Sequence, residues 1–425
     1  MRSVIRKIRR LLFAWQRLVP ARFRWYKVHS QLVLICLTGI IFLNTLFGVY
    51  LGRFDFRRRK FVFSKLVTAY SFVMATIFVA YYIWHVYEEM STGQLSRSHT
   101  IEIYCYMNVC VCLINYVTQW EKTSQIIGFQ NSVPLFEILN SMDVSLKVVT
   151  KSFTYSIIKT IACPLIEYVA LSLYQRRAHP ELNWTSFATA RTMLPVLVAN
   201  QINNCFFGGL VIADLVVHAI NRKLEDLVKE ANMLQTPVQM GLHKPYYRMR
   251  RFCELADGLD EMVEKYYYCA ILSKGYLRFT DWSMVLSMLM NLIGITLGFY
   301  NQYMAIADHY INEEPFDFYL SIVLLVFLSV PFMELVMVAR ISNQTLRETR
   351  KTGDLLQQID LQNADVRFKQ VVHSFWLHVS TINYKLVPLG LLELNTNLVN
   401  SVFSSVTGFL LILIQSDLTL RFSLK

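Results

Sequence analysis

The segment LVPLGLLELNTNLVNSVFSSVTGFLLILIQSDLTLRFSLK, residues 386–425, decides the fold of this chain. No charged residue occurs in it from Leu398 to Ile414. An α-helix that crosses a bilayer needs about 17–25 predominantly apolar residues, and this uncharged stretch is just long enough. The segment therefore predicts a last transmembrane helix over residues 396–416.

This predicted helix carries a stripe of residues, which we call the polar stripe, that are all small or polar except Leu411. Steps of three and four residues place its members on one helix face: Asn397, Ser401, Ser404, Gly408, Leu411 and Gln415. The other faces are apolar: Val402, Phe403, Val406, Phe409, Leu410, Leu413 and Ile414. Lipid would tolerate the apolar faces and not the stripe. Two alternatives follow, namely a seam where small residues let helices pack closely, or the wall of a water-filled pore.

The composition indicates a polytopic membrane protein embedded in a lipid bilayer. The 425 residues are 54% hydrophobic and 17% charged, whereas soluble domains average about 45–50% apolar and about 25% charged residues. The net charge of +12 fits basic loops on the cytoplasmic side, not binding to nucleic acid. The eight cysteines form no CxxC pair, so neither a disulfide framework nor a zinc site is expected.

Seven segments are predicted to span the membrane: 66–87, 101–119, 153–175, 192–220, 283–305, 317–340 and 396–416. Residues 31–52 are also apolar, but both of their flanks are basic, and one crossing cannot satisfy the positive-inside rule on both sides. We expect 31–52 to be a non-spanning pre-helix within a cytoplasmic N-terminus, 1–65; an eighth span is the alternative. Residues 1–30 predict a basic amphipathic helix on the membrane surface, with a mitochondrial transit peptide as the alternative.

Charge fixes the predicted orientation. With the N-terminus inside, 35 of the 42 Lys and Arg residues fall on the cytoplasmic side and six fall outside. The tail 417–425 is then extracellular, and Asn183 begins a glycosylation sequon in an outer loop. The inner loop 221–282 and the segment 341–395 show helical apolar patterns, which predict cytoplasmic anchor helices that pack as a base. The predicted fold class is all-α, with seven transmembrane helices.

The sequence contains no enzymatic motif such as GxSxG, HExxH, a P-loop or GxGxxG, and we expect neither catalysis nor a cofactor. Ionisable residues within spans are functional candidates because their burial is costly, and these are Lys159, Glu167, Asp214 and Glu334. Structural pairing or snorkelling near the inner interface is the competing interpretation for Asp214 and Glu334. A ligand pocket combines aromatic walls with a few polar groups. Candidates in the outer halves of the spans are Tyr104, Tyr168, Tyr300, Asn301, Gln302, Tyr303 and Tyr319, although tyrosines also mark membrane interfaces.

The C-terminal segment resembles the end of the insect gustatory receptors, whose last helix carries Thr-Tyr, five apolar residues and Gln-Phe. Here the register gives Gly408-Phe409, five apolar residues from Leu410 to Ile414, and Gln415-Ser416. Gln415 and the apolar five match outright, whereas Gly408 replaces Thr and Ser416 replaces Phe. Upstream, the sequence GLLELN at 390–395 resembles the Gly-apolar-apolar-x-Leu-Asn lead-in of the family.

The resemblance implies a tastant-gated cation channel in the plasma membrane of gustatory neuron dendrites. It would assemble as a tetramer, homomeric or mixed with other gustatory receptor subunits. A small-molecule tastant would bind in the outer half of the helix bundle, and the last helices would line one central pore. The implied pore and gate residues are Gly408, Phe409, Leu411, Ile412, Gln415 and Ser416.

Three alternatives stay open. The first is a non-conducting or auxiliary subunit, which the changed terminal motif suggests. The second is a G-protein-coupled receptor, which would need the N-terminus outside and lacks DRY and NPxxY signatures here. The third is a transporter, for which internal repeats would be typical.

Overall fold

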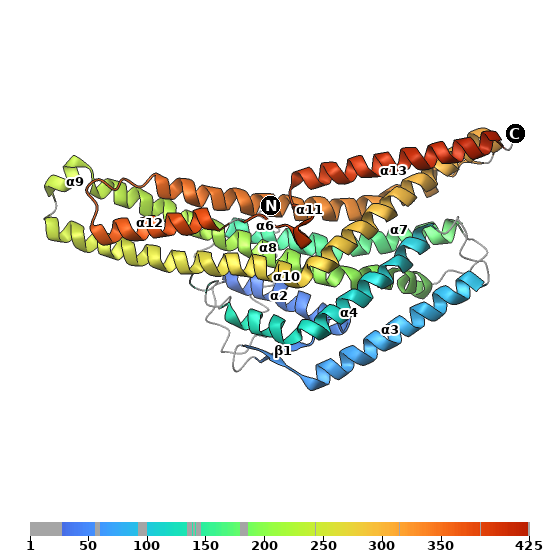
Figure 1. Cartoon of the computed structure of the whole chain (residues 1–425), viewed down its shortest axis with the longest axis horizontal. Coiled ribbons are helices and arrows are strands. Elements are labelled where there is room, and N and C mark those ends of the chain that lie inside the picture. The colour runs from blue at the N-terminus through green and yellow to red at the C-terminus, as the bar shows by residue number, and fades with distance from the viewer. Residues whose placement is uncertain are drawn as a thin grey trace.

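The computed structural model describes residues 28–55, 60–91, 100–133, 138, 141, 146–178, 186–242, 244–313, 315–382 and 384–423. Long helices run side by side along one axis (Figure 1). They are α2 (Val28–Leu46), α3 (Lys65–Ser91), α4 (Thr100–Ser132), α6 (Leu146–Ile157), α7 (Cys163–Ala178), α8 (Ser186–Leu234), α9 (Pro237–Leu242), α10 (Pro245–Asn312), α11 (Phe318–Gln357), α12 (Val366–Thr381) and α13 (Thr396–Ser423). A π-helical turn, η3 (Ile158–Ala162), joins α6 to α7, and a 3₁₀ turn, η4 (Pro388–Gly390), precedes α13. The expected surface helix at the N-terminus and the sequon at Asn183 lie outside the described residues.

Seven helices within the described residues are long and apolar enough to cross a membrane. Each predicted span falls in one of them, except that Asp317 is the residue that caps the start of α11, and the 153–175 span falls in the continuous run from Lys147 to Arg177. The all-α class with seven transmembrane helices is confirmed. The apolar segments form helices because their backbone groups must pair internally where water is absent.

Three of the helices are far longer than a bilayer requires. α10 has 68 residues, which corresponds to about 100 Å at about 1.5 Å per residue. The ends of α8, α10 and α11 that lie beyond the predicted spans contribute with α12 to one hydrophobic core, towards the end of the molecule where α9 lies (Figure 1). Phe252, Phe368 and Phe375 are among the fully buried side chains of the large core formed there. We call this region the helical base. It contains the segments predicted as anchor helices.

The segment after α2 differs from the sequence expectation. The helix ends at Leu46, because the Asn44 carbonyl accepts hydrogen bonds from the N–H groups of Val49 and Tyr50 and a turn follows at Gly48. Gly48 has φ +70°, and a Cβ there would lie 3.2 Å from Met74 Cβ on α3, so glycine suits both the turn and the close packing. Two short antiparallel strands follow, β1 (Gly52–Asp55) and β2 (Lys60–Phe63), with Gly52 opposite Phe63. The sequence analysis did not predict this hairpin, and the non-spanning role of 31–52 stays a prediction.

Candidate functional site

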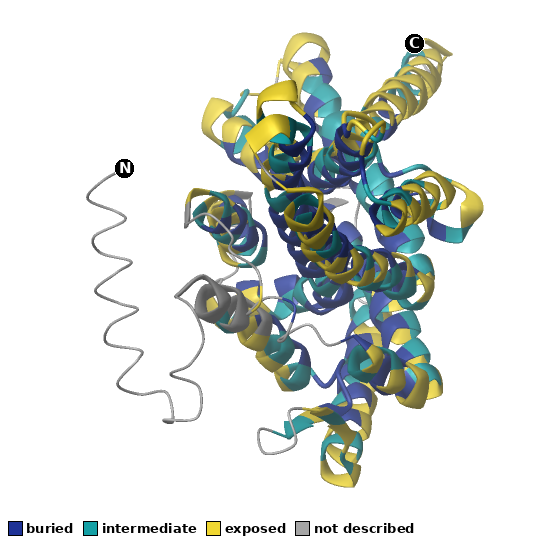
Figure 2. Ribbon diagram, turned by 90° about the vertical axis from the view of Figure 1, so that its left-hand side faces the viewer, coloured by how far each residue is buried: buried dark blue, intermediate teal, exposed yellow. Residues whose placement is uncertain are grey.

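The polar stripe of α13 faces away from the rest of the chain. All six stripe residues are exposed, whereas Leu398 and Val406 are buried and Val402, Leu410 and Leu413 are half-buried. At about 100° per residue, the buried side and the stripe lie on opposite sides of the helix. Figure 2 shows the helix that ends at the C label standing at the edge of the bundle, with most of its surface exposed. The stripe is therefore not a packing seam within the described chain.

The residues implied for the pore share this exposure. Gly408, Leu411 and Gln415 lie on the stripe itself, and Phe409, Ile412 and Ser416 flank it. All six are exposed in the single chain, so their side chains are available to water, lipid or another subunit. Lipid is a poor environment for the Gln415 amide, because an unpaired polar group in hydrocarbon is costly.

A network of charged groups holds the outer end of α13 against α10, and we call it the outer ion-pair network. Arg421 donates from Nη1 to Asp308 Oδ1 at 2.8 Å and from Nε to Asp417 Oδ2 at 2.7 Å. The Tyr303 hydroxyl on α10 donates to the same Asp417 oxygen at 3.2 Å. Tyr303 was predicted from the sequence as a ligand residue, and here it contacts the pore-helix candidate.

A second site forms around a buried ion pair. Pro164 has no N–H to offer the preceding turn, and the helix widens there: the Cys163 N–H bonds to the Ile158 carbonyl, five residues back. The widened turn η3 carries Lys159, whose Nζ lies 3.1 Å from Glu334 Oε2 on α11. Both side chains are buried, with 2% and 7% of their surface exposed.

This ion pair identifies the partner of Glu334, for which the sequence suggested structural pairing. Lys159 Nζ also lies 5.8 Å from the ring centroid of Phe207, a favourable position for a cation. Asp214, for which the sequence also suggested structural pairing, accepts a hydrogen bond of 2.7 Å from Gln344 Nε2. Glu167 is buried on α7 and interacts electrostatically with both members of the pair.

A cavity adjoins the ion pair, with about 410 Å³ of empty space including its opening. We call it the ion-pair cavity. Its polar lining comprises Lys159, Glu334, Asn200, Asn203, Ser287 and Asn291. The amides of α8 were missed in the sequence analysis. The signal was present, because Asn200, Gln201, Asn203 and Asn204 interrupt the middle of an apolar span, where amides are costly.

The predicted ligand residues do not converge on one site. Tyr104 is buried, and its hydroxyl donates to Asn291 Oδ1 at 2.9 Å, which connects it to the ion-pair cavity. Gln302 donates instead to the Ser321 carbonyl on α11, and Tyr168 donates to the Ser186 carbonyl on α8. The remaining three lie elsewhere: Tyr300 stacks near Tyr303, Asn301 is half-buried, and Tyr319 is exposed.

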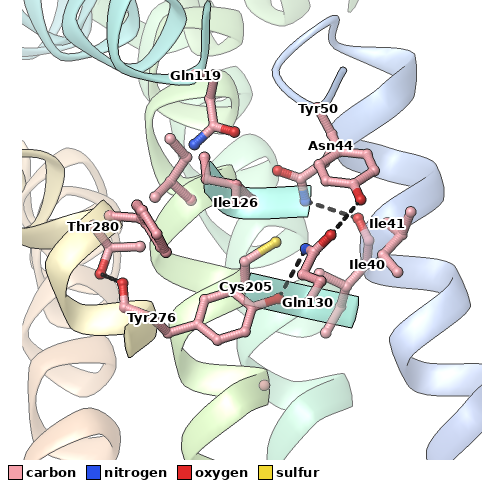
Figure 3. A pocket seen from close by; sticks show the side chains of 13 residues that line it. Ile40, Ile41, Asn44, Tyr50, Gln119, Ile126, Gln130, Cys205, Tyr276 and Thr280 are labelled. Atoms are coloured by element: carbon pink, nitrogen blue, oxygen red, sulfur yellow. Dashed lines mark hydrogen bonds between the residues drawn. The ribbon is translucent and has the colours of Figure 1, made fainter. Parts of the chain in front are cut away.

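Another cavity lies between α2, α4, α8 and α10, with about 620 Å³ of empty space including its opening. A chain of hydrogen bonds crosses its wall: the Tyr50 hydroxyl donates to Gln130 Oε1 at 2.6 Å, and Gln130 Nε2 donates to the Tyr276 hydroxyl at 3.1 Å (Figure 3). Gln130 thus links two tyrosines of the lining into one network.

Comparison with known proteins places these features in a family. A family model described as 7tm chemosensory receptor matches residues 30–420. The chain is 69% identical over the full length of both chains to "Putative gustatory receptor 97a" of Drosophila melanogaster. It is 26% identical over 218 residues, about half of each chain, to "Gustatory receptor for bitter taste 93a" of the same species.

Solved structures give the same fold. The olfactory receptor OR5 of Machilis hrabei, determined in complex with eugenol, matches with a TM-score of 0.56 and 9% identity, covering 89% of this chain and 97% of that one. The two chains therefore share one all-helical fold. On the extent of the family match and the 69% identity, the chain belongs to the insect gustatory receptor family.

Proposed function

We propose that this protein is a subunit of a tastant-gated cation channel in which α13 of each subunit lines a central pore. The observation that carries the proposal is the outward polar stripe, whose six members are all exposed while the opposite face packs on the bundle. A polar face at membrane depth needs water or protein beside it. In an assembly of several copies around an axis, the stripe of each copy would contact both water in the central pore and the protein of the neighbouring copies.

The proposed assembly is a tetramer, either homomeric or with other gustatory receptor subunits, in the plasma membrane of gustatory neuron dendrites. The helical base is the region that would join the subunits, as the family resemblance implies. Gln415 and Ser416 would stand at the outer mouth of the pore. Because Ser416 replaces the family's final Phe, the hydrophobic constriction would be formed by Leu411 and Ile412, which gate by excluding water when the pore is narrow.

The proposed ligand is a small-molecule tastant bound inside the bundle. From the sequence we expect this site in the outer half of the helix bundle. Tyr104 supports a site that extends inwards from there, because its hydroxyl bonds to Asn291 of the ion-pair cavity. Met284 and Val338 of the cavity wall belong to the same core as Leu398 at the inner end of α13. A ligand that displaces this wall would therefore move the pore helix.

The proposal is tested by electrical recording from cells that express the full chain, alone and with other family members, during exposure to taste compounds. A cation channel gives a reversal potential that shifts when external sodium is replaced by a large organic cation. Gln415→Ala should change the conductance or the ion selectivity, whereas Phe403→Leu, a conservative change away from the stripe, should change neither. If Gln415→Ala kept the current and selectivity of the unmodified channel, the pore assignment would fail.

A further inference from the structure

The ion-pair cavity contains hydrogen-bond acceptors that the protein leaves unused. Glu334 is 95% buried by residue, since 5% of its surface is exposed, and its Oε1 has no hydrogen-bond partner among the described residues. The Asn203 Oδ1 atom is likewise buried without a partner there. Both residues line the cavity. An unsatisfied buried acceptor costs about 1–3 kcal/mol, and more when it is charged, so a molecule that supplies donors would stabilise this site.

A third ionisable side chain interacts with the ion pair at the cavity. Glu167, a buried carboxyl group on α7, interacts electrostatically with both Lys159 and Glu334. Carboxylates in a low-dielectric interior are strongly destabilised unless a positive charge compensates them. A buried carboxyl group that lacks such a charge is stable only when protonated, and a cationic ligand beside Glu334 would supply a compensating charge as well as a hydrogen-bond donor.

The remaining residues of the cavity lining are apolar. Phe206, Met284, Met288 and Leu335 are among them, and methionine side chains adapt readily to ligands of different shape. The cavity therefore offers a carboxylate and an amide oxygen together with flexible apolar side chains. This arrangement matches a compact apolar molecule that carries a hydrogen-bond donor with a positive charge.

We propose that the ion-pair cavity binds small molecules with a protonated amine and a compact apolar body, with the ammonium donating to Glu334 Oε1 and Asn203 Oδ1. This inference rests on the proposed receptor function and deepens it by naming the chemical class of the ligand. The ammonium group of Lys159 competes with that of the ligand for the Glu334 carboxylate, because Lys159 Nζ already lies 3.1 Å from Glu334 Oε2.

The test uses the purified full-length protein in detergent and two probes of the same shape. Benzylamine is protonated at neutral pH, whereas benzyl alcohol is neutral. Their affinities are measured by the concentration dependence of thermal stabilisation. We expect benzylamine to bind the unmodified protein about tenfold or more tightly than benzyl alcohol, because hydrogen bonds to a charged acceptor contribute on that scale.

Three variants make the test specific. Glu334→Gln should abolish the preference for the amine. Since this change leaves Lys159 buried without its partner, the double variant Lys159→Met/Glu334→Gln replaces the whole pair by neutral groups and should also show no preference. Tyr276→Phe alters the other cavity and should keep the full preference.

Equal binding of the two probes by the unmodified protein would overturn the inference, and so would an amine preference that survives in the double variant. Because binding is measured without any current, failure of the amine site is distinct from failure of the proposed channel. A protein that conducts but shows no amine preference refutes only the ligand class. One that prefers the amine but never conducts refutes only the channel.

Discussion

The outer ion-pair network predicts how strongly α13 is held in the described position. We expect the proposed pore to open by separation of the outer ends of the α13 helices, with each α13 shifting against its own α10, so the contact of Arg421 with Asp308 on α10 belongs to the closed channel. Arg421→Ala removes these contacts and the one to Asp417 together. We expect the variant to open more often without ligand.

The magnitude follows from the exposure of the groups. The Arg421 and Asp308 side chains are 19% and 28% exposed and their closest atoms lie 2.8 Å apart. Ion pairs with access to solvent contribute about 0.2–1 kcal/mol. If that energy is lost only from the closed state, the ratio of open to closed channels rises by a factor of about 1.4–5 per subunit. The effect should be largest at low ionic strength outside the cell, where screening is weakest.

The assay is single-channel recording without ligand. Arg177→Ala is the matched control, since the Arg177–Asp317 pair, at 2.6 Å, joins α7 to the start of α11 and does not touch α13. The swap Asp308→Arg/Arg421→Asp should bring the open probability back towards that of the unmodified channel. An unchanged or reduced open probability in Arg421→Ala would refute the reasoning that this network holds the channel closed.

Three further predictions concern the topology and the fold. Epitope tags should stain intact cells at the C-terminus and only permeabilised cells at the N-terminus, whereas a hidden C-terminal tag would require an even number of spans. Phe375→Ala should lower the free energy of unfolding by about 3–5 kcal/mol, because the ring is fully buried in the helical base against Tyr266; a change below 1 kcal/mol in detergent unfolding would contradict this. Gly48→Ala should lower the unfolding temperature more than Gly390→Ala, since both glycines have positive φ but only Gly48 lacks room for a Cβ.

The spans could be predicted from the sequence because each is an uncharged or nearly uncharged apolar run of bilayer length. The ends of the helices could not. α10 continues from Pro245 to Asn312 without a breaker, so no local signal separates its membrane part from its helical base part. α13 similarly continues to Ser423, beyond the predicted boundary at 416. The short strands β1 and β2 depend on pairing with each other, and four-residue strands carry little periodic signal.

The candidate site was predictable only in part. The polar stripe is a local pattern of spacing, and its outward orientation follows from the apolar faces that pack instead. The Lys159–Glu334 pair joins residues far apart in the chain, and only the tertiary packing of η3 against α11 brings them together. The tyrosines were a weaker guide, because membrane interfaces enrich tyrosine whether or not a ligand binds. Of that group, only Tyr104 is bonded to a residue of the ion-pair cavity.

Cysteine accessibility along α13 tests the central proposal most directly. Single cysteines replace three residues of the stripe, Ser404, Gly408 and Leu411, and two of the packed face, Val406 and Leu410. A water-soluble thiol reagent is then applied to open channels during recording. The account predicts that the reagent changes the current at the three stripe positions and leaves it unchanged at the two packed positions. Modification without helical periodicity, or modification strongest at Val406 and Leu410, would contradict a pore lined by the polar stripe.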